Sequence, residues 1–275
     1  KEGFKLYENR LDIKSVKFKQ RNFKKPLWLG NQNISGKRLF VHLEQGLGDM
    51  IQMYRYVNEL DKLDIQVILE VNKSLKKLFS DNAKNAYVVC EGDVFSEDDF
   101  DYHCPIMSLP LAFKTDLDSI ISPSSYIKAS ANLVEEWRGK LPKKTKPFIG
   151  IVWAGSSTIK ARTITFSQFS SLFRDDCQFV SLQKEVPSSD YEDLKKNNQV
   201  LHFGDQLRDF SDTAALLECM DLVISIDTSV AHLAGSMGKT TWALIINSPD
   251  WRWLLERDDS PWYSSVKLFR QSLRN

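Results

Sequence analysis

Cysteine is scarce in this chain, and its few copies are scattered. The four cysteines, Cys90, Cys104, Cys177 and Cys219, form neither a CxxC pair nor the spacing of a zinc site. Their wide spacing also argues against the disulfide frameworks of small secreted domains. The sequence therefore predicts a protein of a reducing compartment, which we expect to be the cytoplasm.

An excess of charge of either sign is lacking as well. The 37 Lys and Arg residues are balanced by 36 Asp and Glu residues, which leaves a formal net charge of +1. A protein that binds duplex nucleic acid carries a clear basic excess, so we expect no nucleic-acid partner. No apolar run approaches the roughly 18 residues that a transmembrane helix needs, so no membrane span is predicted either.

What the sequence does contain is a series of short apolar runs at regular intervals. In the first half, runs of strand length alternate with amphipathic segments. The predicted strands cover 38–43, 65–71, 87–90 and 100–103, and the predicted helices cover 49–60 and 74–79. This alternation indicates a parallel sheet covered by helices.

The alternation restarts after a polar, lysine-rich stretch at 139–147, which has the composition of a linker. The later strands are predicted at 148–153, 178–182, 200–203, 222–226 and 241–246, and the helices at 165–173, 211–220 and 229–237. At about 150 residues per domain, the chain length suits two domains. We predict an α/β protein of two Rossmann-like lobes, each with a parallel sheet, and a cleft between the lobes. A leader would cover 1–36, the first lobe 37–143 and the second lobe 144–275.

The leader is the basic part of the chain. Residues 1–25 hold nine Lys or Arg against three acids, with apolar side chains between the charges. We favour a leader that packs on the body of the protein with a solvated basic face. The alternative is a docking surface for an acidic acceptor or partner.

The strongest local signal for chemistry is the segment 222–239, in which an apolar strand leads directly into Asp227, Thr228 and Ser229 and then into a helix of small residues. Ligands of open α/β sheets bind outside the carboxyl ends of the strands. The first N–H groups of the following helix and its positive end attract phosphate. These residues are therefore predicted to bind a phosphate group. The alternative is that Thr228 only caps the helix while Asp227 holds a neighbouring loop.

Two more loops are expected at the same edge of the second sheet. Ser156 and Ser157 follow the strand at 148–153, with the cations Lys160 and Arg162 close behind. Hydroxyls and cations at a strand end suit a diphosphate, although an exposed polar loop would have the same composition. Three loops that converge on one edge make the diphosphate site a stronger prediction than any one loop does. The third of these loops carries Gln183 and Lys184, after the strand at 178–182.

In the first half, a glycine turn joins the first strand to the first helix. Gln45, Gly46 and Gly48 form this turn, and Asp49 follows at the start of the helix. Glycine permits a tight turn and the close approach of a ligand, but the segment is not a GxGxxG dinucleotide fingerprint. Asp49 is a candidate general base for an acceptor hydroxyl, or only a helix cap. His103 is the second candidate, and a lone His at a strand end is more often structural.

A divalent metal is not expected. No DxD follows a strand in the manner of a metal-binding loop, and Asp99–Asp101 is the nearest approach. Lys160, Arg162 and a helix dipole would neutralise a leaving group without metal. The tryptophans of the segment 250–263 could stack on a sugar or base, or pin the C-terminal segment to the core.

Four segments carry a resemblance to a known family. They are EQGLGDMIQMYRYV (44–57), DYHCPIMSLPLAF (101–113), DFSDTAALLECMDLVISIDTSVAHLAGSMGK (209–239) and PDWRWLLERDDSPWY (249–263). Together they resemble the glycosyltransferase domain of bacterial tetratricopeptide-repeat proteins, which is related to the ADP-heptose:lipopolysaccharide heptosyltransferases. The resemblance implies a GT-B fold, with the acceptor on the first lobe and a nucleotide-sugar donor on the second. The leader resembles the stretch after the repeats, which implies that repeats lie upstream and that Lys1 begins a piece of a longer protein.

The resemblance also implies roles for individual residues. Asp49 matches the proposed base, and Ser156, Ser157 and, within a residue of register, Lys160 match a donor-binding group. Asp227, Thr228 and Ser229 match the second donor-binding turn, and His232 of the same block joins this set. Arg162-Thr163 departs mildly from the Arg-Ser often found in related repeat proteins.

The function expected from residues and resemblance together is inverting, metal-independent glycosyl transfer from a nucleotide sugar, with no cofactor. The acceptor would be a protein side chain, because the implied repeats bind polypeptides; a lipid-linked glycan is the alternative. A catalytically idle nucleotide-sugar-binding scaffold is the competing hypothesis. A nicotinamide-dependent oxidoreductase is disfavoured because the dinucleotide fingerprint is absent.

Overall fold

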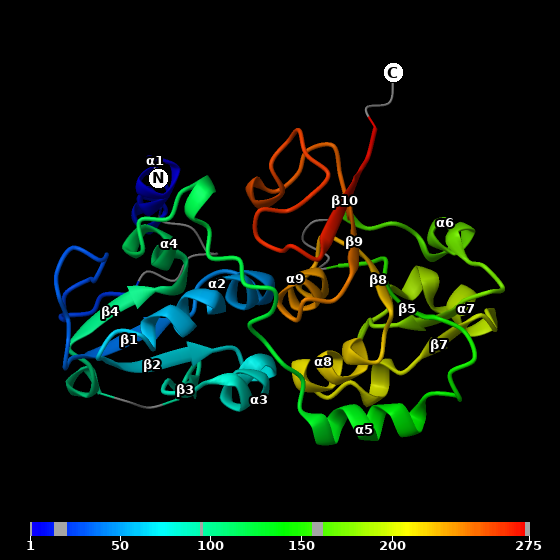
Figure 1. The fold of residues 1–275 in the computed structure, drawn as a ribbon, viewed down its shortest axis with the longest axis horizontal. Coiled ribbons are helices and arrows are strands. Elements are labelled where there is room, and N and C mark those ends of the chain that lie inside the picture. Colours follow the sequence, from blue (N-terminus) through cyan, green and yellow to red (C-terminus); the bar gives the residue numbers. More distant parts are fainter. Residues whose placement is uncertain (1, 14–20, 94–95, 156–161, 273–275) are drawn as a thin grey trace. The chain divides into compact units, whose positions relative to one another are not determined.

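The computed structural model describes residues 2–13, 21–93, 96–155 and 162–272. The chain forms two compact units, Lys1–Ser122 and Pro123–Asn275 (Figure 1). Each unit contains its own parallel sheet with helices beside it. The predicted α/β class with two parallel sheets is confirmed.

The first unit is built on a sheet of strand order β3-β2-β1-β4, in which every neighbouring pair is parallel. Its strands are β1 (Arg38–His42), β2 (Gln66–Val71), β3 (Tyr87–Cys90) and β4 (Tyr102–Pro105). Its helices are α1 (Glu2–Tyr7), α2 (Leu47–Leu60), α3 (Lys73–Asn82) and α4 (Leu109–Ala112). The glycine turn follows the inner strand β1, so it lies at the middle of the carboxyl edge of this sheet.

The second unit has a sheet of strand order β10-β9-β8-β5-β6-β7, again parallel throughout. Its strands are β5 (Phe148–Val152), β6 (Gln178–Ser181), β7 (Val200–His202), β8 (Leu222–Ile226), β9 (Thr241–Ile245) and β10 (Val266–Arg270). Its helices are α5 (Ala131–Lys140), α6 (Phe166–Phe169), α7 (Ser188–Lys196), α8 (Phe210–Glu218) and α9 (Ser229–Ser236). Strands β8, β5 and β6 are direct neighbours, so the three loops expected to converge do leave the same edge of the sheet.

Helix α9 packs closely against the Tyr263 ring because the helix residue at this contact is glycine. A Cβ at Gly235 would stand 2.6 Å from the ring of Tyr263, so only glycine lets that ring approach. The helix ends at Ser236, and Gly238 shortly after it has a φ of +72°. Glycine adopts this left-handed conformation without steric cost, which suits the residue after a helix.

Three elements of the second unit were not predicted: α5, α7 and β10. Helix α5 packs on α8 (Figure 1). Between these helices, the indole Nε1 of Trp137 donates to Asp212 Oδ1 at 3.2 Å. Because α5 belongs to the second unit, the chain divides after Ser122, which differs from the division after 143 drawn from the lysine-rich stretch. Helix α8 is capped by Asp209, whose carboxylate accepts from the Ser211 amide.

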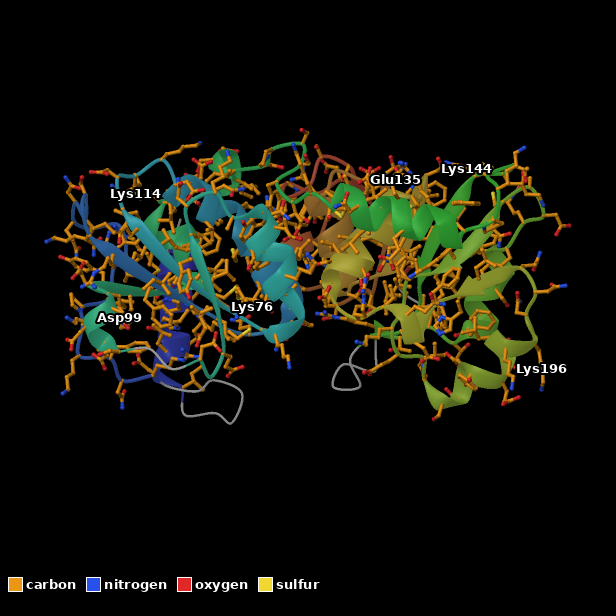
Figure 2. The ribbon with its side chains drawn as sticks, turned by 90° about the horizontal axis from the view of Figure 1, so that it is seen from below. Lys76, Asp99, Lys114, Glu135, Lys144 and Lys196 are labelled. Carbon is orange, nitrogen blue, oxygen red and sulfur yellow. The ribbon has the colours of Figure 1, made fainter. Side chains whose placement is uncertain are left out.

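The surfaces of both units carry charges of mixed sign. Figure 2 labels six charged side chains, Lys76, Asp99, Lys114, Glu135, Lys144 and Lys196, and all six are exposed. None of the helices in the described ranges is both long enough and apolar enough to cross a bilayer.

Candidate active site

The junction of β8 and α9 holds a buried acid that faces a cation. Asp227 follows β8 directly and is 8% exposed, and its Oδ2 lies 3.0 Å from Arg162 Nη1. Burial raises the pKa of Asp227, and the nearby Arg162 opposes this shift. Arg162 Nη2 also lies 3.7 Å from Asp250 Oδ2. One guanidinium is thus shared by two carboxylates that come from the ends of β8 and β9.

His232 lies beside Asp227 at this junction. Its Nε2 lies 3.9 Å from Asp227 Oδ1, and its Nδ1 forms a hydrogen bond of 2.9 Å with the Tyr263 hydroxyl. The imidazole stacks on Trp253, with ring centroids 5.3 Å apart and an interplanar angle of 17°. Trp253 is fully buried, which supports the interpretation that it pins the C-terminal segment to the core. Trp251, in contrast, is 40% exposed and carries the Arg252 guanidinium 4.6 Å above its ring.

The start of α9 is not capped by a side chain. Thr228 stands at the N-cap position, but its hydroxyl makes no capping bond and instead lies 3.1 Å from Ser225 Oγ. Of the alternative interpretation, the cap by the Thr228 side chain is wrong, whereas Asp227 does hold the neighbouring loop through Arg162. Ser229 is half-buried at the first position of the helix. The first N–H groups of α9 therefore receive no capping bond from the Thr228 side chain.

The loop after β5 comes close to this helix start. A Cβ at Gly155 would lie 3.3 Å from Thr228 Cγ2, so the two loops are in contact. Ser156, Ser157 and Lys160 lie outside the described residues. Arg162, at the far end of that loop, is described and bonds to Asp227 as above.

Gln183 holds the same loop in place from β6. Its Oε1 accepts from the Trp153 and Ala154 amides, both at 2.8 Å, and its Nε2 donates to the Glu185 carbonyl at 2.9 Å. The carboxamide thus braces the ends of β5 and β6 through both its oxygen and its nitrogen. Lys184 is exposed, and its Nζ donates to the carbonyl of Arg208 at 2.9 Å.

Sequence reasoning missed a second brace, Asp190. This buried carboxylate on α7 accepts from the Trp153 indole Nε1 at 2.9 Å and from the Phe166 amide at 3.2 Å through the same oxygen. It also missed Asp250, the second partner of Arg162. Asp250 stands in the PDWRW segment quoted above, but no spacing rule connects it to Arg162, which is 88 positions earlier.

The glycine turn of the first unit has its strained residue at an unexpected place. Gln45 has a φ of +64°, so the left-handed conformation falls on a non-glycine residue. Gly46 is extended and donates its N–H to Asp49 Oδ2 at 2.7 Å, while Gly48 lies inside α2. Asp49 thus serves as the local cap of α2, the simpler of the two interpretations given above, and it stands half-buried at the carboxyl end of β1.

His103 lies among aromatic rings on β4, the outermost strand of its sheet. It pairs in register with Phe40 of β1, and its Nδ1 lies 3.4 Å from His42 Nε2. The Phe23 ring centroid is 4.7 Å from that of His103. Burial lowers the pKa of both histidines, that of His42 to about 3. This setting favours the structural interpretation of His103.

No group of three or more His, Cys, Asp or Glu residues suited to a metal ion occurs among the residues that the structure describes. The segment Asp99–Asp101 has a different use. Asp101 forms an ion pair with Arg38 at 3.0 Å, and Asp99 caps a short 3-10 helix by accepting from the Ser96 amide at 2.7 Å.

Comparison with known proteins connects this geometry to solved folds. A crystal structure of a glycosyl transferase of family 9 from Veillonella parvula aligns over 87% of this chain and 87% of its own, with a TM-score of 0.61 and 14% identity. The ADP-heptose lipopolysaccharide heptosyltransferase II of E. coli aligns over 86% and 91%, with a TM-score of 0.60 and 12% identity. The fold is that of the family 9 glycosyltransferases.

Two further comparisons extend this finding. E. coli heptosyltransferase WaaC, solved with ADP-2-deoxy-2-fluoro heptose, aligns over 86% of this chain and 93% of its own, with a TM-score of 0.54 and 11% identity. Protein FlbA of Caulobacter vibrioides is 26% identical over 98% of this chain and 49% of its own length. The chain thus spans about half the length of this curated relative. No family model matches the sequence.

Proposed function

We propose that the chain is a glycosyltransferase of the GT-B type that transfers a sugar from a nucleotide-sugar donor to an acceptor hydroxyl. The observation that carries the proposal is the edge shared by β5, β8 and β6, where the uncapped start of α9, Gly155 and the Arg162–Asp227 pair meet. The second unit would bind the donor, and the first unit, through its glycine turn, would bind the acceptor.

The donor diphosphate would lie at the start of α9. The helix N–H groups, Thr228 and Ser229 supply donors there, and Arg162 supplies a positive charge that Asp227 and Asp250 hold in place. Ser156, Ser157 and Lys160 would complete this site, with His232 and Gln183 supporting it from behind. Because WaaC was solved with ADP-2-deoxy-2-fluoro heptose, an ADP-sugar is the first donor to test.

The reaction is an inverting displacement. Asp49 takes the proton of the acceptor hydroxyl, the oxygen forms a bond to the anomeric carbon, and the bond from that carbon to the diphosphate oxygen breaks. The leaving diphosphate carries the electron pair away and is stabilised by the cation, hydroxyls and helix end described above. These groups make the transfer independent of metal. The acceptor is a protein side chain, presented in the cytoplasm by tetratricopeptide repeats upstream in the full-length protein, with a lipid-linked glycan as the alternative.

A thermal-shift screen tests donor binding. ADP-heptose and ADP-, UDP-, GDP- and CMP-sugars are each added with and without EDTA. A donor at about 100 times its Kd stabilises the fold by roughly 2.7 kcal/mol, which is readily detected as a rise in Tm. We expect a selective shift that EDTA does not change. No shift with any donor contradicts the proposal.

Matched variants locate the site and separate binding from catalysis. Thr228→Val combined with Ser229→Ala is expected to weaken donor binding, whereas the exposed pair Ser167→Ala and Ser171→Ala is expected to leave it unchanged. Equal affinity in both double variants rejects the diphosphate assignment. Asp49→Asn is expected to abolish transfer and to preserve the donor-induced shift. Donor binding by the unaltered chain without turnover on any acceptor favours the idle scaffold.

A further inference from the structure

Two leader arginines pair with acids close to the glycine turn: Arg10 with Glu44, just before the turn, and Arg21 with Glu70 on the neighbouring strand β2. The segment Glu2–Asp12, called the N-terminal strap below, consists of α1 and the 3-10 helix η1 (Glu8–Asp12). It carries Arg10, which is 4% exposed despite its charge. Further along, Arg21 lies 2.7 Å from Glu70 on β2. A buried arginine in a basic, mostly exposed leader requires a specific set of partners.

Arg10 has such a set. Its Nε and Nη2 donate to the two oxygens of Glu44 at 2.7 and 2.8 Å, a bidentate pair. Its remaining N–H groups donate to Glu8 Oε1 at 2.7 Å, to the Tyr7 carbonyl at 3.1 Å and to Ser108 Oγ at 2.8 Å. These bonds occupy all five N–H donors of a guanidinium, so Arg10 is fixed in one orientation.

Two partners of the strap, Glu44 and Gln45, lie at the start of the glycine turn. Glu44 immediately precedes Gln45, the residue with positive φ, and the Gln45 side-chain amide bonds to the Tyr7 hydroxyl of the strap. On the other side, Glu70 accepts from both Arg21 and the Leu43 amide, the latter at 3.2 Å. The strained backbone at Gln45 is thus held by side chains from outside the turn, as strained backbone requires.

We propose that Arg10 is a positioning residue, and that the N-terminal strap holds the β1–α2 turn in the conformation that places Asp49. As far as Asp49 acts in transfer, this inference rests on the proposed function. The statement that the strap orders the turn does not depend on the proposed function. A solvated basic leader with no such role would contact the turn through exposed, interchangeable lysines rather than through one buried arginine.

Hydrogen exchange of the full chain tests the hold of the strap on the turn. Arg10→Gln is expected to speed amide exchange in residues 43–50 on the order of tenfold and to leave α3, in the same unit, unchanged. Arg10→Lys, which retains the charge but not the bidentate bond, is expected to give an intermediate rate. The matched control is Arg38→Gln, because Arg38 pairs with Asp101 at the opposite end of the same strand, β1. That control is expected to leave residues 43–50 unchanged.

Two outcomes overturn the inference: unchanged exchange at 43–50 in Arg10→Gln, or an equal rise there and in α3. Turnover supplies a second readout, measured at a temperature where circular dichroism shows the variant to be as fully folded as the unaltered chain, because a partly unfolded sample would also lower kcat at unchanged KM. Hydrolysis of the nucleotide sugar identified by the thermal-shift screen uses water as acceptor and should show a lower kcat in Arg10→Gln with an unchanged donor KM. If no donor binds, the proposed function fails, and the exchange rates still decide whether the strap orders the turn.

Discussion

Replacement of Gln183 by methionine is expected to destabilise the second unit by about 2–7 kcal/mol. The variant keeps the length of the side chain but removes the acceptor of two buried amides, those of Trp153 and Ala154. A buried donor left without a partner costs roughly 1–3 kcal/mol, and two are left here. The change in volume adds less than about 1.5 kcal/mol, because glutamine and methionine are of similar size.

Urea unfolding followed by tryptophan fluorescence measures this loss. Only Trp28 lies in Lys1–Ser122, so the signal reports mainly on the second unit. The control is Gln178→Met at the opposite end of β6, where the amide donates to the carbonyls of Phe179 and Gln199 at a half-buried position. Those carbonyls can bind water, so a loss below about 1 kcal/mol is expected. A loss for Gln183→Met no larger than that of the control refutes the assignment of Gln183 as a brace.

Two further predictions concern the same unit. Burial raises the pKa of Asp227 in the folded state above its value in the unfolded state. The free energy of unfolding therefore falls as pH rises from the unfolded pKa to the folded pKa, and it stays at the lower value above that range. Asp227→Asn should therefore become more stable relative to the unaltered chain between pH 4 and pH 7 in urea unfolding, and a difference that shrinks contradicts this. Gly235→Ala should cost about 1–3 kcal/mol, because its Cβ would meet the Tyr263 ring at 2.6 Å. Gly139→Ala, in α5 with nothing within 4 Å, should stabilise by about 0.5–1 kcal/mol, and calorimetry that ranks the two the other way refutes the contact.

The strands were predictable because buried parallel strands are continuous apolar runs bounded by polar turns. Helices α5 and α7 were not, because their buried stripes are thin. Helix α5 buries Val134 and Trp137, and α7 buries only Leu194 and the acid Asp190. A buried carboxylate reverses the pattern on which a sequence prediction depends.

In the candidate site too, some residues could be predicted from the sequence and others could not. Asp227 and Thr228 were predicted because a local motif, strand to helix through small polar residues, carries its own physical meaning. The Arg162–Asp250 and Arg10–Glu44 contacts depend on where distant segments meet, and no local periodicity encodes such a contact. The positive φ of Gln45 was equally hidden, since glycine was the expected residue for that conformation.

The last strand has a consequence for how the segment 246–265 behaves. Strand β10 pairs in parallel with β9, and the Gln271 amide donates to the Ile245 carbonyl, so the sheet holds both ends of that segment. A loop fixed at both ends loses its conformational freedom during folding rather than during ligand binding. The contacts of Arg162 and His232 with Asp250, Trp253 and Tyr263 thus form during folding. A chain shortened before Val266 would keep these three residues but lose the strand that fixes their segment next to the buried acid Asp227.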